Sequence, residues 1–116
     1  MELAHIYHAE VSVLNVFLPL AAYPGVPHDH LDPEVYAARV KEEIARQVDP
    51  IAGEVSYQLC QEQGHPAETL VAFAEKRQAD LIVVGSRGQG GFQRLLLGSV
   101  STSVLHHAHC SILVVR

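Results

Sequence analysis

The chain alternates between short apolar runs and longer segments in which apolar residues recur every three or four positions. The short runs are rich in β-branched residues and too short for helices, so they predict buried strands of a parallel sheet. These strands are residues 10–17, 54–60, 81–84 and 111–115. The longer segments predict helices at residues 2–8 (the end of a helix), 32–48, 66–78 and 99–107. Strands that alternate with helices indicate an α/β fold.

Helix boundaries follow from local signals. Asp32 and Pro33 form an N-cap followed by proline at the first helical position, and Asp49-Pro50 predicts the end of that helix near Val48. The predicted buried stripe of this helix consists of Val35, Tyr36, Val40, Ile44 and Val48. The inward residues predicted for the helix at 66–78 are Leu70, Val71, Phe73 and Ala74. Several prolines and a glycine predict a loop at residues 18–31.

A glycine-rich segment follows the strand at 81–84. It runs from Gly85 through Gly88 to Gly98-Ser99, where Ser99 is predicted to cap the next helix. A strand, a glycine-rich loop and a helix N-terminus with a hydroxyl group form a common phosphate site, because backbone N–H groups and the helix dipole favour anions. A tight strand-to-helix turn that needs glycine only for its conformation is the alternative interpretation.

The spacing of these glycines excludes two common phosphate loops. The segment has no Gly-Lys-Ser/Thr of a Walker A loop, and Gln93 stands where the dinucleotide fingerprint needs its third glycine. The remaining pattern, Gly85-x2-Gly88-x9-Gly98-Ser99, resembles the nucleotide-binding signature of the universal stress protein (UspA-like) family. The flanking segments at residues 79–86 and 97–100, and the chain from 104 to its end, resemble the same family.

This resemblance implies a three-layer open parallel sheet, adenine nucleotide alpha hydrolase-like and Rossmann-like, with strand order 3-2-1-4-5. It also implies that ATP or AMP, with Mg²⁺ as a companion ion, lies across the carboxyl ends of the strands. Carried onto this chain, the nucleotide-binding residues are Val16 and Val84 near the adenine, Gly85 and Gly88 near the ribose and phosphates, and Gly98, Ser99 and Val100 at the phosphates. Arg87 and Arg94 are added as phosphate neighbours because of their charge.

The family's first strand and most of its first helix have no counterpart in this sequence. The family's early aspartate, which helps to hold the nucleotide, is also absent from it. In the family order the absent strand is the central one, between the strands at 10–17 and 81–84. Three explanations are open: an upstream start with Met1 internal, direct pairing of these two strands, or a strand supplied by a partner chain. We expect the first, because the remaining pattern is intact.

The length, the cysteine spacing and the charge distribution of the chain limit the classes of protein to which it can belong. The 116 residues predict one domain, residues 1–116, and neither a signal peptide nor a membrane span is expected. Cys60 and Cys110 lack metal-type spacing and predict reduced thiols in the cytoplasm. All 13 acidic residues lie at or before Asp80, and the net charge of −5 argues against nucleic-acid binding. The only charged residues after Asp80 are arginines, which suit an anionic ligand.

The predicted function is a universal stress protein that binds ATP or AMP as a regulatory ligand in the stress response. No paired carboxylates, nucleophile–base couple or Walker-type lysine lies near the loop, so we predict no enzyme and no catalytic residue. The alternative is a dimeric interaction protein without nucleotide binding, and in either case a homodimer through the strand at 112–115 is expected. Histidines at His28/His30 and His106–His109 suggest Zn²⁺ or Cu²⁺ ligation, but a solvated loop and a helix C-terminus explain them without a metal.

Overall fold

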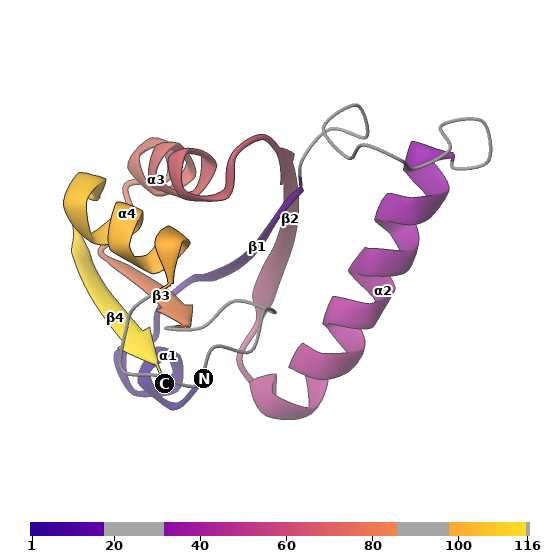
Figure 1. Cartoon of the computed structure of the whole chain (residues 1–116). Helices are drawn as coiled ribbons and strands as arrows, with labels where there is room; N and C mark the ends of the chain where they lie inside the picture. The colour runs from indigo at the N-terminus through magenta and orange to yellow at the C-terminus, as the bar shows by residue number, and fades with distance from the viewer. Residues whose placement is uncertain (18–31, 86–97, 116) are drawn as a thin grey trace. The chain divides into compact units, whose positions relative to one another are not determined.

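The fold was analysed in a computed structural model, which describes residues 1–17, 32–85 and 98–115. The predicted loop at 18–31 and the predicted site residues Arg87, Gly88 and Arg94 lie outside these ranges. Contacts between Cα atoms divide the chain into two compact units, Met1–Gln63 and Gly64–Arg116 (Figure 1). Each unit is described by itself.

The first unit is built around a parallel pair of strands. Its elements are α1 (Glu2–Tyr7), β1 (Val11–Phe17), α2 (Pro33–Ala52) and β2 (Tyr57–Gln63). The β1–β2 ladder is parallel and runs in register from Val11 opposite Tyr57 to Phe17 opposite Gln63. Helix α2 connects the two strands (Figure 1), and the Gln61 side chain donates a hydrogen bond of 3.0 Å to the Ala37 carbonyl. Parallel strands need such a helical crossover, because a short turn cannot return the chain.

Helix α2 begins as predicted and ends later than predicted. Asp32 is the N-cap: its Oδ1 accepts a hydrogen bond of 3.0 Å from the Glu34 N–H, and Pro33 follows at the first helical position. The prediction that Asp49-Pro50 ends the helix is wrong, because α2 continues through Pro50 to Ala52. Proline has no N–H to donate to the carbonyl four residues earlier, so this turn continues without that one helical hydrogen bond, and Ala52 at its end is buried. The end comes at Gly53, whose φ of 57° favours glycine.

The buried face of α2 is shorter than the predicted stripe. Val40, Ile44 and Val48 are half-buried, whereas Val35 and Tyr36 expose about half of their surface. The half-buried face starts at Ala37, whose carbonyl meets β2, so the first turn precedes the part that packs on the strand. Because α2 extends to Ala52, β2 also begins three residues later than predicted.

The second unit contains a second parallel pair. Its elements are α3 (Pro66–Lys76), β3 (Leu81–Gly85), α4 (Ser99–His107) and β4 (Ser111–Val115), and the last two match their predicted ranges. The β3–β4 ladder runs from Leu81 opposite Ser111 to Gly85 opposite Val115. Its core consists of Ala74 of α3, Ile82 of β3 and Val104 of α4, with Val104 fully buried. Both helices therefore cover one face of this pair (Figure 1).

Helix α3 ends two residues before its predicted end. The Arg77 N–H still bonds the Phe73 carbonyl, but Gln78 has a φ of 54°, which stops the helix. The Arg77 guanidinium lies 4.9 Å from the centre of the Phe73 ring, a favourable cation–π distance. The predicted inward positions agree with the structure: Ala74 is buried, Leu70 and Val71 pack against the core, and Phe73 is half-buried.

The strands β3 and β4 are buried on one face, so the prediction that β3 is a buried strand holds for that face and not for the opposite one. Ile82 exposes 5% of its surface, and Val84 and Ile112 pack against the core. The opposite face carries four exposed apolar side chains, which we term the outer face of β3–β4. Its members are Leu81, Val83, Leu113 and Val115. The alternation arises because α3 and α4 cover one side, and successive side chains of a strand point to opposite sides.

The chain has an α/β fold with parallel strands joined by helices, as predicted from its alternating pattern. The ladders among the described residues are β1–β2 and β3–β4, which correspond to strands 2 and 3 and to strands 4 and 5 of the expected order. Direct pairing of β1 with β3 is not among them. Within the described ranges, none of the helices is both long and apolar enough to cross a membrane.

Candidate functional site

The candidate site lies where β3 ends and α4 begins. Gly85 is the last residue of β3, and Gly98 immediately precedes α4. The Ser101 hydroxyl, in the first turn of α4, donates a hydrogen bond of 2.5 Å to the Gly85 carbonyl oxygen. This bond places the first turn of α4 next to the carboxyl end of β3. Ligands of open α/β sheets bind at the carboxyl ends of strands.

The start of α4 has no side-chain cap. Gly98 is the N-cap, with extended backbone angles, and its carbonyl accepts the first helical bond from the Thr102 N–H at 3.0 Å. The prediction that Ser99 caps the helix is wrong, because Ser99 is the first helical residue and its hydroxyl lies past the cap position. Glycine has no side-chain oxygen, so the first N–H groups of α4 donate to no side chain at the cap position.

The electrostatic environment of this helix start favours an anion. The first turn of α4 contains no acidic residue, whereas α2 carries Glu34 and α3 carries Glu68 at the equivalent place. Ser99 is exposed, and Val100 exposes 37% of its surface, so a ligand can reach this turn from solvent. Unpaired N–H groups and the positive end of the helix dipole attract phosphate, sulfate or carboxylate groups.

The structure brings together five of the nine predicted nucleotide-binding residues in the second unit. Val84 and Gly85 end β3, while Gly98, Ser99 and Val100 begin α4. Val84 is half-buried against the core, and Gly85 is exposed. The sixth, Val16, is half-buried in the first unit, where it pairs with Glu62 of β2. The last three, Arg87, Gly88 and Arg94, lie outside the described residues.

Sequence reasoning missed Ser101, the residue that connects the two halves of this site. Ser101 exposes only 3% of its surface and is the sole buried polar residue of the described chain. A signal was present, because Ser101 lies three positions before the apolar Val104 and therefore on the same face of the helix. A hydroxyl on a buried helical face needs a hydrogen-bond partner, which the sequence alone does not identify.

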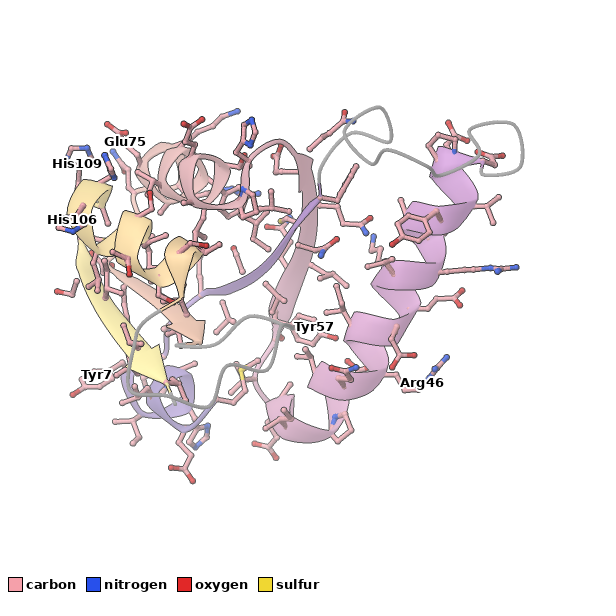
Figure 2. All side chains as sticks on the ribbon, in the orientation of Figure 1. Tyr7, Arg46, Tyr57, Glu75, His106 and His109 are labelled. Atoms are coloured by element: carbon pink, nitrogen blue, oxygen red, sulfur yellow. The ribbon has the colours of Figure 1, made fainter. Side chains whose placement is uncertain are left out.

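The histidines form no metal site in the part of the chain that is described. Figure 2 shows His106 and His109 near the end of α4, on the side of the unit where Glu75 of α3 also lies. No group of three or more His, Cys, Asp or Glu side chains that could hold a metal ion occurs among the described residues. The His107 ring instead lies 2.8 Å from the Ser103 carbonyl, measured from Nδ1. His28 and His30 lie outside the described ranges.

Comparison with known proteins matches the whole chain to the family that its glycine spacing resembles. The model of the universal stress protein family matches residues 1–116. Universal stress protein MJ0531 of Methanocaldococcus jannaschii is 36% identical over 121 residues, which cover all of this chain and 70% of that protein. A universal stress protein of Thermus aquaticus is 32% identical over 115 residues, 97% of this chain and 82% of that protein.

Solved structures show the same fold. The universal stress protein UspA from Lactobacillus plantarum matches with a TM-score of 0.77 and 24% identity, over 99% of this chain and 83% of that one. A universal stress protein in complex with cAMP matches with a TM-score of 0.66 and 24% identity, over 97% of this chain and 78% of that one. A family model and a relative that each span the entire chain confirm the resemblance found in the glycine spacing: the chain belongs to the universal stress protein family.

Proposed function

We propose that this protein binds an adenine nucleotide, ATP or AMP, as a regulatory ligand in the stress response. The observation that carries the proposal is the start of α4, which has no side-chain cap, no acidic residue in its first turn and a solvent-exposed Ser99. Family membership supports the same ligand class, since a universal stress protein of similar fold is described in complex with cAMP.

The residues at this helix start fit a phosphate group. The backbone N–H groups of Ser99 and Val100 would donate to phosphate oxygens, and the Ser99 hydroxyl would add a further donor. Gly85, at the end of β3, has no side chain and leaves the backbone open to the ribose. Gly88 is proposed on the basis of the glycine spacing, and Arg87 on the basis of its charge. Val84 and Val16 are the proposed neighbours of the adenine, and Mg²⁺ would accompany ATP.

We assign the nucleotide a regulatory role and no catalytic one. Acidic residues are absent from residues 81–116, so this part of the chain offers no carboxylate as a general base or as a Mg²⁺ ligand. A site made of backbone N–H groups and one hydroxyl binds phosphate through electrostatics and does not by itself activate water.

Native mass spectrometry with and without ATP–Mg²⁺ tests the proposal. We expect the protein to gain the mass of the nucleotide, and we expect the double substitution Gly98→Ala/Ser99→Ala to remove most of this gain. Thr102→Ala, an exposed change one position past the first turn of the same helix, is the control and should bind like the unaltered protein. Absence of bound nucleotide in the unaltered protein, or full binding by the double variant, would contradict the proposal.

The same experiment tests a homodimer, which we propose to form through β4 in the cytoplasm. Among the described residues β4 pairs with β3 alone, so its other edge offers unpaired backbone groups to a second copy. A dimer without bound nucleotide would favour the second candidate function, an interaction protein that acts without a nucleotide. A monomer at high micromolar concentration would contradict the proposed assembly.

A further inference from the structure

The buried hydroxyl of Ser101 forms a hydrogen bond inside the second unit. Ser101 exposes 3% of its surface and lies on the face of α4 that carries the fully buried Val104. A buried hydroxyl is costly unless it forms a hydrogen bond, and this one donates to the Gly85 carbonyl. Because Ser101 is buried, a ligand at the exposed Ser99 would contact the first turn of the helix without touching this hydroxyl.

The Ser101 bond joins the two ends of the glycine-rich segment. Gly85 precedes residues 86–97 and Gly98 follows them, so the bond ties the start of α4 to the residue from which this segment departs. It also fixes the direction of the Ser99 and Val100 N–H groups relative to the end of β3.

We infer that Ser101 is a positioning residue, which holds the start of α4 against Gly85 and thereby sets the affinity for the phosphate groups of the nucleotide. This inference rests on the proposed nucleotide binding. It assigns Ser101 an indirect effect that increases with the phosphate content of the ligand, because the groups that it positions are the proposed phosphate donors.

Isothermal titration calorimetry with ATP and with adenosine, which has no phosphate, tests this role. Ser101→Ala should weaken ATP binding about tenfold, the effect of one lost buried hydrogen bond, and change adenosine binding by less than about twofold. Ser103→Ala is the matched control, because it makes the same chemical change in the same helix at a half-buried position. It should leave both affinities unchanged.

Each outcome separates this inference from the proposed function. If the unaltered protein binds no ATP, the proposed function fails and the role of Ser101 fails with it. If the unaltered protein binds ATP and Ser101→Ala binds it equally well, or loses ATP and adenosine binding to the same extent, only the positioning role is wrong.

A second pair of variants keeps the inference testable if Ser101→Ala does not fold. Ser101→Thr keeps a hydroxyl donor, whereas Ser101→Cys keeps a side chain of similar shape with a much weaker donor. We expect the threonine variant to bind ATP within about threefold of the unaltered protein, and the cysteine variant to bind about tenfold more weakly. Equal ATP affinities of these two variants would overturn the inference.

Discussion

Val83 and Leu113 lie directly opposite each other in the parallel β3–β4 ladder, and both are exposed, with 57% and 41% of their surface open. Their neighbour Ile82 points to the other side of the strand and exposes only 5%. The pair lies at the centre of the outer face of β3–β4. Together with Leu81 and Val115 it makes this face of the strand pair apolar.

We expect replacement of this pair by threonine to reduce surface hydrophobicity at little cost in stability. The variant Val83→Thr/Leu113→Thr should bind much less of a fluorescent hydrophobic dye, and its free energy of unfolding should change by less than about 1 kcal/mol, because exposed positions tolerate substitution. Ile82→Thr is the contrasting control, since it places a hydroxyl in the core. A loss of several kcal/mol in the double variant would mean that this face is covered in solution.

Val104 is the side chain on which the second unit depends most. It is fully buried against Ala74 and Ile82, so Val104→Ala should lower the free energy of unfolding by about 2 kcal/mol through lost burial and the cavity left behind. Chemical denaturation measures this loss. Leu105→Ala, the adjacent change at a residue that exposes 44% of its surface, should cost far less. Equal losses in the two variants would contradict the assigned core.

Loss of the N-cap of α2 should lower the free energy of unfolding by less than Val104→Ala does. Asp32→Ala removes the acceptor of the Glu34 N–H and should lower the free energy of unfolding by about 1 kcal/mol. Asp32→Asn retains a side-chain oxygen at the same place and should stay close to the unaltered protein. The comparison is made by urea denaturation, and a similar loss in both variants would point to the charge of Asp32 as the cause.

The hydrogen bond of Tyr57, the first residue of β2, predicts that the stability of the fold depends on pH (Figure 2). The Tyr57 hydroxyl donates to Asp49 Oδ1, and this hydrogen bond, followed by partial desolvation and the nearby negative charge, raises the pKa of Tyr57 above 10.0. The folded state therefore favours the protonated phenol. Its contribution to stability is complete below pH 10 and disappears as the pH rises through the raised pKa of the folded state.

Ultraviolet titration of tyrosinate measures this shift. The difference between the unaltered protein and Tyr57→Phe isolates the titration of Tyr57, and we expect its midpoint above the usual value for tyrosine. Asp49→Ala should return the midpoint toward that usual value, because it removes both the acceptor and the charge. An unchanged midpoint in the alanine variant would assign the shift to another cause.

Much of the fold could be predicted from local patterns. Helix α4 and strand β4 match their predicted ranges. The β-branched apolar run after Cys110 is too short for a helix, which favoured a strand there. The end of α2 was predicted wrongly, because the rule that proline stops a helix ignores tertiary burial, and α2 continues through Pro50 to the buried Ala52. The exposure of Val83 depends on what covers each face of a sheet, which no local pattern contains.

The candidate site was predictable in part. The glycine spacing identified the family, because its positions match the family signature, and the family model matches the whole chain. The bond between Ser101 and Gly85 was not predictable, since it joins residues that are adjacent only in the folded structure. Nucleotide binding and the roles of Arg87 and Gly88 remain predictions.

The two ladders have different requirements for assembly. Each joins strands separated by a single helix, so neither ladder needs residues of the other. The partners in β3–β4, such as Leu81 and Ser111, are closer along the chain than Val11 and Tyr57, which makes that ladder cheaper to close by about 0.4 kcal/mol of chain entropy. On the ribosome, however, residues through Gln63 emerge first. Synthesis therefore makes the β1–β2 pair available first, whereas chain entropy slightly favours the β3–β4 pair during refolding from denaturant.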